Sequence, residues 1–176
     1  TEYCGLFNES YVNSQVTANG WVLTKRDMGG VIFIDLKDRE GVLQTVFDAN
    51  DVSHEVFLLA EQVKLQSVVE ISGYIKIRGE ETYNPKIRTG TIELKAEQMT
   101  ILSECSSLPF AMDDEVCVKE ELRLKYRYLD IRRSEISENL LFRHKAVSII
   151  RRYLEGNGFI EVETPILTKS TPEGAR

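Results

Sequence analysis

Three side chains in the first part of the sequence could together read an unpaired nucleobase. Phe33 offers an aromatic ring for stacking, Gln44 offers an amide, and Glu93 offers a carboxylate that can only accept hydrogen bonds. Stacking of a base on an aromatic ring contributes roughly 1 to 3 kcal/mol. These residue types predict binding of single-stranded RNA if the fold brings them to one surface. The cations that could meet phosphates are Lys25, Arg26 and Arg78.

The sequence contains no recognisable catalytic set and no metal-binding pattern. Its cysteines, Cys4, Cys105 and Cys117, form no C-x-x-C pair, and its two histidines, His54 and His144, lie far from them in sequence. An odd number of cysteines without a secretory signal argues against a disulfide framework. We therefore expect ordinary thiols in a reducing compartment.

Composition indicates a folded chain that is not inserted in a membrane. Of the 176 residues, 42% are hydrophobic, which is enough for one core of domain size or two small ones. No apolar run approaches the roughly 20 residues of a membrane span. The N-terminus lacks the charged and apolar regions of a signal peptide. The expected location is the cytoplasm.

The net charge of −6 divides the sequence into three parts. Residues 1–102 hold 10 basic and 15 acidic residues, residues 103–121 hold 1 and 6, and residues 122–176 hold 11 and 7. Since the first part is mildly acidic, it cannot bind nucleic acid by bulk attraction, which favours a specific reader over a nonspecific coat. The middle part also lacks a sustained period, so we expect a linker between two domains.

Hydrophobic periodicity predicts a small barrel in residues 1–102. Runs with strand-like alternation are interrupted by one stretch, 51–63, whose apolar residues share a helical face. Five short strands with a helix between the third and fourth are typical of the OB-fold, an all-β barrel whose face on strands 2 and 3 binds oligonucleotides. The predicted strands cover residues 16–26, 31–37, 42–48, 68–78 and 90–102.

Alternation along the second strand decides which of its side chains point outward. The aliphatic residues take the core side, so Phe33 and Asp35 share the outer side. A two-residue loop at 39–40 would place Asp35 opposite Gln44 and Phe33 opposite Val46. An outward ring could instead be covered by a loop or a neighbouring domain, and alternation alone leaves both alternatives open.

The same rule divides the fourth and fifth strands between the two faces. Glu93 is expected to point outward, on the surface that carries Phe33. The fourth-strand residues expected to face the core are Ile71, Gly73, Ile75 and Ile77. Those expected to face outward are Ser72, Tyr74, Lys76 and Arg78.

Residues after the linker begin a short α+β domain. Ser134 is expected to be the N-cap of a long helix, because acidic residues follow it in the first turn. The helical spacing of apolar residues continues until Gly156 or Gly158 supplies a stop. A short strand is expected at residues 160–163, and Pro165 ends it.

Four segments together carry a resemblance to a known family. They are residues 20–27, 30–41, 124–130 and 163–169. These segments resemble the N-terminal third of aspartyl-tRNA synthetases of class II, most closely the bacterial form. The resemblance implies that the barrel is the anticodon-binding domain, with the anticodon loop of tRNA(Asp) as its partner.

The resemblance also implies roles for the outward-facing residues. Phe33 would stack on the middle uridine of the anticodon, and Gln44 would hydrogen-bond the edge of that base. Glu93 would meet the first base, which suits the chemistry because guanine offers N–H donors on its Watson–Crick edge. The side chains that would hold the loop backbone or the third base are Lys25, Arg26 and Arg78.

Residues near the C-terminus resemble two further elements of that family. Gly158, Phe159 and Pro165 match motif 1, which implies a homodimer interface. Glu173 matches the loop glutamate that contacts the substrate ammonium, here that of L-aspartate. Motifs 2 and 3, which hold ATP, do not appear. The parent enzyme would use ATP and Mg²⁺, whereas this fragment alone is expected to bind no cofactor and to be inactive.

Two alternatives remain beside this reading. One is a stand-alone OB-fold module that coats single-stranded nucleic acid, and the other is the asparaginyl or lysyl relative, which shares both domains. Family members that charge both tRNA(Asp) and tRNA(Asn) often carry histidine where this chain has Met28. Met28, also expected near the anticodon, therefore favours a discriminating enzyme. The long helix would expose a large apolar face without the rest of its domain.

Overall fold

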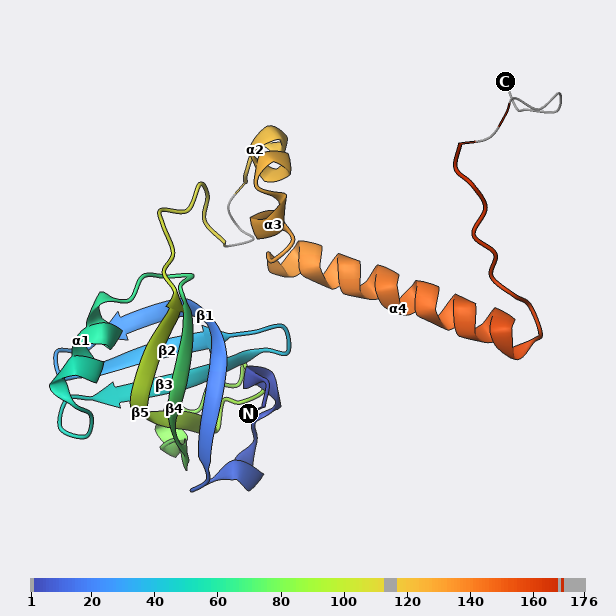
Figure 1. The fold of residues 1–176 in the computed structure, drawn as a ribbon. Helices are drawn as coiled ribbons and strands as arrows, with labels where there is room; N and C mark the ends of the chain where they lie inside the picture. The colour runs from blue at the N-terminus through green and yellow to red at the C-terminus, as the bar shows by residue number, and fades with distance from the viewer. Residues whose placement is uncertain (1, 113–116, 168, 170–176) are drawn as a thin grey trace. The chain divides into compact units, whose positions relative to one another are not determined.

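Five alternating segments of the sequence form a closed barrel in the computed structural model of the chain (Figure 1). The structure describes residues 2–112, 117–167 and 169. Internal contacts divide the chain into two units, Thr1–Ser107 and Leu108–Arg176, and each is described by itself. No helix among the described residues is long and apolar enough to cross a membrane.

The strand and helix order of the first unit confirms the predicted OB-fold. The elements are β1 Gln15–Asp27, β2 Val31–Lys37, β3 Val42–Asp48, α1 His54–Gln62, β4 Val68–Ile77 and β5 Ile92–Ser103. The strands pair in the order β1-β2-β3-β5-β4. The pairing of β1 with β4 closes the ring, and β3 pairs with β5 in parallel.

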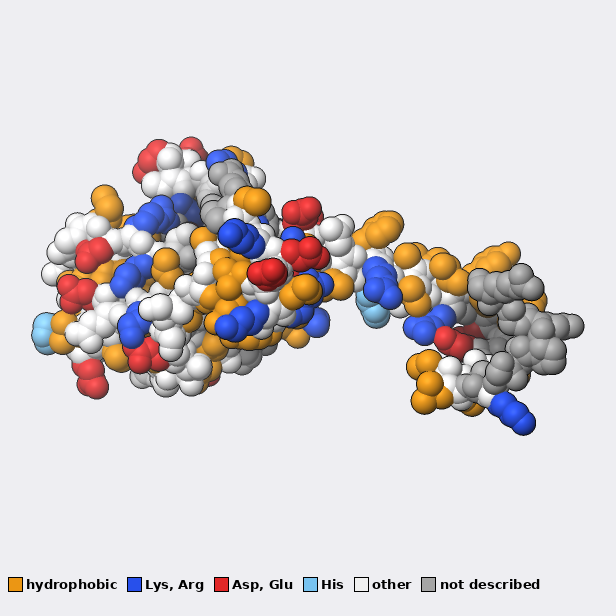
Figure 2. Space-filling view, turned by 90° about the horizontal axis from the view of Figure 1, so that it is seen from above, with side chains coloured by type: hydrophobic (Ala, Val, Ile, Leu, Met, Phe, Trp, Pro, Cys, Tyr) orange, Lys and Arg blue, Asp and Glu red, His pale blue; other side chains and the backbone are white. Residues whose placement is uncertain are grey.

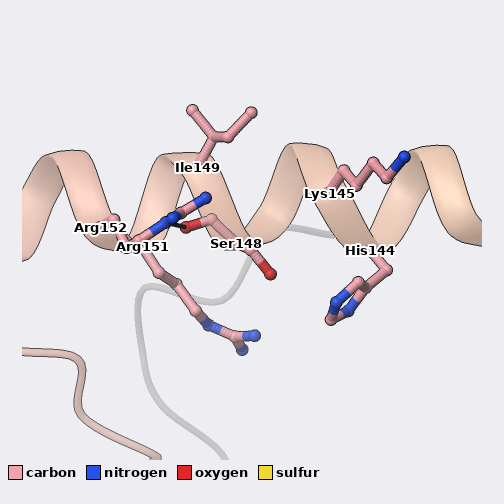
Figure 3. Close-up of a pocket in the computed structure, with 6 residues that line it drawn as sticks. All are labelled: His144, Lys145, Ser148, Ile149, Arg151 and Arg152. Carbon is pink, nitrogen blue, oxygen red and sulfur yellow. Dashed lines mark hydrogen bonds between the residues drawn. The ribbon is translucent and has the colours of Figure 1, made fainter. Parts of the chain in front are cut away.

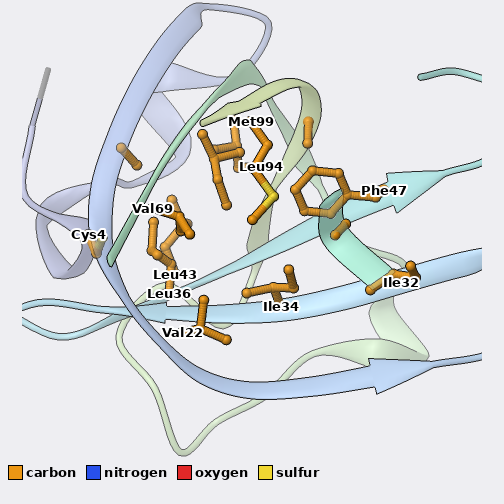
Figure 4. Packing of buried hydrophobic residues seen from close by; sticks show 14 of the residues in the cluster. Cys4, Val22, Ile32, Ile34, Leu36, Leu43, Phe47, Val69, Leu94 and Met99 are labelled. Carbon is orange, nitrogen blue, oxygen red and sulfur yellow. The ribbon is translucent and has the colours of Figure 1, made fainter. Parts of the chain in front are cut away.

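The hydrophobic core fills the interior of this barrel (Figure 4). Ile32, Ile34 and Leu36 of β2 are fully buried, as alternation predicted. Phe47 from β3 and Leu94 from β5 point into the same interior in Figure 4. Full burial of one such side chain contributes about 1.5 to 3 kcal/mol, so the alternation on β2 fixes which residues remain outside.

The predicted alternation was wrong at the end of β4. Ile77 was expected in the core but is 54% exposed. Arg78, expected to face outward, does lie beside Glu93 of the outer face, although its side chain is only 9% exposed. Ile77 is the last residue of β4, and the pleat that enforces alternation holds only within a regular strand.

The register between β2 and β3 follows the prediction residue for residue. Phe33 lies opposite Val46, and Asp35 lies opposite Gln44. Asp38 shapes the turn between these strands, because its Oδ1 accepts hydrogen bonds from the backbone N–H groups of Glu40 and Gly41. The hairpin therefore places Gln44 diagonally from Phe33 on the outer face.

The N-terminal segment packs against the turn of this hairpin. Its first 3-10 helix, Cys4–Leu6, contains two buried residues, Cys4 and Gly5. The backbone N–H of Cys4 donates to Asp38 Oδ2. A Cβ atom at Gly5 would lie 2.0 Å from the backbone oxygen of Glu40, so only glycine fits there. The segment thus holds the turn in place.

Cys4 and Cys117 are expected to differ in their reactivity toward alkylating reagents. Burial and the nearby Asp38 carboxylate raise the pKa of the Cys4 thiol, which keeps it protonated at neutral pH. Cys117 is exposed. Iodoacetamide followed by mass spectrometry should modify Cys117 in the native chain and Cys4 only after denaturation. Equal rates at both thiols in the native chain would contradict the burial of Cys4.

The second unit begins with two short helices, α2 Glu120–Lys125 and α3 Arg127–Asp130. The side chain of Asp130 is fully buried, and Arg123 Nε donates to it at 2.8 Å. Arg127 also donates to this carboxylate. The hydrogen bond from Arg123 lowers the pKa of Asp130. The ion pair between Arg123 and Asp130 connects α2 to α3.

Helix α4 spans Ser134–Gly156, close to its predicted extent. Ser134 was expected to be the N-cap, but it is the first helical residue, and Arg133 occupies the cap position with φ −65° and ψ 142°. The N–H of Arg133 bonds to the carbonyl of Asp130. Helix α4 therefore begins one residue earlier than it would if Ser134 were the N-cap.

Gly158, one of the two glycines predicted to stop the long helix, provides the stop of α4. Its φ is +83°, a conformation that glycine adopts without steric cost. The N–H of Gly158 bonds to the carbonyl of Glu155, and the N–H of Phe159 bonds to that of Leu154. This pair of bonds is a Schellman motif.

The short strand predicted at residues 160–163 does not form in the described part of the chain, so this prediction was wrong. A strand needs a neighbour to satisfy its backbone N–H and C=O groups, and Ile160 and Val162 lie exposed. The expected apolar exposure of α4 is confirmed, because none of its residues, all of which the structure describes, is buried.

Candidate nucleic-acid interface

Phe33 lies on the outer face of β2, where alternation placed it, and the group over its ring is an arginine. The guanidinium carbon of Arg26, on β1, lies 5.5 Å from the centre of the Phe33 ring, within the range of a cation–π contact. Arg26 Nη2 also donates to Gln44 Oε1 at 3.0 Å. The Phe33 ring and the Gln44 amide therefore both contact Arg26 on the outer face of the barrel.

The contacts continue from Gln44 to β5 and the end of β4. Gln44 Nε2 donates to Glu93 Oε2 at 2.9 Å, and Arg78 Nε lies 3.9 Å from the same oxygen. Nε and Nη1 of Arg78 are buried without a hydrogen-bond partner. Gln44 itself is only 4% exposed, so its amide is enclosed by charged neighbours.

Asp35 also lies close to Arg26, and Thr24 in turn contacts Asp35. Asp35 Oδ1 lies 3.8 Å from Arg26 Nη2, and the hydroxyl of Thr24 donates to Asp35 Oδ2. Sequence reasoning missed Thr24, although its place two residues before Arg26 on β1 puts both on one face. We call the connected set the outer-face cluster; its members are Thr24, Arg26, Phe33, Asp35, Gln44, Arg78 and Glu93.

The structure does not bring Lys25 or Met28 into this cluster. Lys25 Nζ donates to the carbonyls of Glu61 and Val63 at the C-terminal end of α1, where a cation complements the helix dipole. Met28 lies in the turn between β1 and β2 and is 74% exposed.

Charges on the barrel are mixed rather than gathered by sign. On the barrel face seen in Figure 2, Lys and Arg side chains are interspersed with Asp and Glu. No three His, Cys, Asp or Glu side chains among the described residues lie together as metal ligands would. The barrel therefore offers shaped contacts, not a uniform basic field.

The second unit contributes fewer of the expected site residues. Gly158 and Phe159 lie just beyond α4 and bond back to its last turn, and Pro165 follows in a segment without helix or strand. Glu173 lies outside the described residues. A shallow hollow on α4 is lined by side chains that project from one stretch of the helix (Figure 3), and none of them is an expected ligand contact: His144, Lys145, Ser148, Ile149, Arg151 and Arg152.

Comparison with known families matches both parts of the chain. Residues 16–102 match the family described as OB-fold nucleic acid binding domain, and residues 119–176 match tRNA synthetases class II (D, K and N). An asparaginyl-tRNA synthetase structure from Pyrococcus horikoshii superposes with a TM-score of 0.84 at 27% identity, covering 98% of this chain and 38% of that one. The fold and the two family matches thus place the chain in the class II tRNA synthetases, as a segment that joins an OB-fold to part of the synthetase domain.

Curated relatives narrow the class further. The chain is 49% identical over its whole length to the aspartate–tRNA ligase of Staphylococcus epidermidis, of which it spans 30%. It is also 49% identical over its whole length to an aspartate–tRNA(Asp/Asn) ligase of a Geobacillus species, again over 30% of that protein. By sequence, the chain belongs to the aspartate–tRNA ligase family.

Proposed function

We propose that this chain is the anticodon-reading part of an aspartate–tRNA ligase and that its barrel binds the anticodon loop of tRNA(Asp). The observation that carries the proposal is the outer-face cluster, in which a ring, an amide and a carboxylate are connected on one barrel face. Unpaired bases of RNA loops are read by this combination of stacking and edge contacts. The mixed charge of the barrel supports a reader that depends on shape.

In the proposed complex the middle uridine stacks on Phe33 and meets Gln44 with its edge. Arg26 must leave the ring for this to happen, and its side chain, 56% exposed, has the freedom to turn toward a phosphate. Arg26 is better placed for this than Lys25, whose ammonium already bonds two carbonyls of the helix end.

Glu93 is proposed to accept hydrogen bonds from guanine at the first position. Arg78, behind Glu93, would support this carboxylate and approach the third base. We assign to Met28 a preference for tRNA(Asp) alone. Sequence identity does not decide between an aspartate–tRNA ligase and an aspartate–tRNA(Asp/Asn) ligase, since a relative of each kind is 49% identical to this chain.

We further propose that the whole protein joins L-aspartate to tRNA(Asp) with ATP and Mg²⁺ and forms a homodimer through the region of Gly158, Phe159 and Pro165. Glu173 would contact the ammonium of L-aspartate. Motifs 2 and 3, which would hold ATP and Mg²⁺ in the whole protein, are not in this sequence. No step through either group is assigned to this chain.

Competition between anticodon stem-loops tests the proposal. A fluorescently labelled stem-loop with the anticodon GUC is bound to the chain and displaced by unlabelled GUC, GUU or UUU stem-loops. Because a wrong base typically costs 1 to 3 kcal/mol, GUC should compete at least about fivefold better than either rival. Equal competition by all three would contradict the proposal and support a nonspecific coat, whereas a winning UUU loop would indicate the lysyl relative.

A further inference from the structure

The amide of Gln44 is held in one orientation by two charged neighbours. Its Oε1 accepts from Arg26 and its Nε2 donates to Glu93. A guanidinium has only donors and an ionised carboxylate only acceptors. Turning the amide over would therefore set N–H against N–H and oxygen against oxygen. Since Gln44 is almost fully buried, water could not replace the lost hydrogen bonds.

Of the two neighbours of Gln44, Glu93 is held in place more firmly than Arg26. Its side chain is half as exposed as that of Arg26, and Arg78 Nε approaches the same Oε2 that accepts from Gln44. Oε2 of Glu93 thus accepts a hydrogen bond from Gln44 and lies within ion-pair distance of Arg78. When a base displaces Arg26 from Phe33, this side of the cluster can stay in place and keep Nε2 of Gln44 where it is.

A fixed amide distinguishes the two pyrimidines. Uracil presents an N3–H donor between two carbonyl acceptors, whereas cytosine presents N3 as an acceptor beside an amino donor. An oxygen of Gln44 that cannot turn away accepts from N3–H of uracil but meets the lone pair on N3 of cytosine. An amide that was free to turn could exchange its N–H and oxygen and so serve either base.

We propose that Glu93, by holding Nε2 of Gln44, sets the preference for uracil over cytosine at the middle position of the anticodon. Glu93 is then a positioning residue for the second base in addition to its own contact with the first. This inference rests on the proposed function and adds to it a physical source of specificity at a base that Glu93 does not touch.

Two variants at one position isolate this role. Glu93→Gln and Glu93→Ala remove the same charge, so any effect on the first base through charge is matched between them. Only glutamine keeps a side-chain oxygen that can accept the hydrogen bond from Gln44 Nε2. Each chain is titrated with GUC and GCC stem-loops by fluorescence anisotropy, and the ratio of the two dissociation constants is compared. Thermal melting verifies that each variant is folded.

The wild-type ratio should favour GUC by roughly 5- to 150-fold. Glu93→Gln should keep the ratio close to that of the wild type even if both affinities fall, whereas Glu93→Ala should bring the ratio close to one. An unchanged ratio in Glu93→Ala, or an equal collapse in both variants, would overturn the inference alone. A wild type indifferent to every anticodon base would overturn the proposed function as well.

Discussion

Replacing Phe33 with alanine is expected to weaken binding of the GUC stem-loop by roughly 5- to 150-fold. The ring lies on the outer face of β2, whereas its neighbours Ile32 and Ile34 are fully buried. The substitution therefore removes the surface on which a base stacks and leaves the core untouched. Fluorescence titration measures the affinity, and a thermal melt close to that of the wild type shows that the barrel is intact.

A second aromatic residue provides the matched control. Tyr74 is an exposed ring on the outer side of β4, paired with Lys95 of β5 and outside the outer-face cluster. Tyr74→Ala should change the affinity by no more than about twofold, as expected of a surface change away from the binding contacts. If Phe33→Ala bound as well as the wild type, Phe33 would be a ring covered by Arg26 and nothing more.

Replacing Gly73 with alanine is expected to lower the free energy of unfolding of the barrel by about 3 kcal/mol. A Cβ atom at Gly73 would lie 2.0 Å from the backbone oxygen of Lys95, across the pairing of β4 with β5. Backbone cannot give way as a flexible side chain does, so the strands must separate and lose hydrogen bonds. Urea unfolding followed by the fluorescence of Trp21 measures the change.

Gly30 offers the control for this substitution. A Cβ atom there would meet no heavy atom within 4 Å, so Gly30→Ala should leave the stability unchanged or raise it by up to about 1 kcal/mol. Indistinguishable unfolding curves for the two alanine variants would show that β4 and β5 are not as close at Gly73 as the structure places them.

The barrel and the centre of its outer face could be predicted because two simple rules govern them. Alternation assigned Phe33 to the outer side, and the length of the β2–β3 turn fixed Asp35 opposite Gln44. Both rules depend on neighbouring residues and one short hairpin. The family resemblance added which anticodon bases are expected to meet these side chains, and strand alternation cannot supply that.

The remaining differences arise where the partner of a residue lies far away in sequence. Lys25 has the charge for a phosphate, but the end of α1, nearly forty residues later, takes its ammonium. Arg78 lies just beyond a regular strand, where alternation no longer applies, and its guanidinium lies behind Glu93. The segment 160–163 has a strand-like sequence, yet a strand also requires a second strand beside it.

The contact between the N-terminal segment and the β2–β3 turn has a consequence for how the domain should be delimited. The matched family covers residues 16–102, yet Cys4 and Phe7 belong to the hydrophobic core. A protein trimmed to residues 16–102 would lack the N-terminal segment that packs against Glu40 and the rest of the β2–β3 turn. The hairpin could then slide or fray, and the proposed anticodon recognition would decline although every residue proposed to contact RNA was still present.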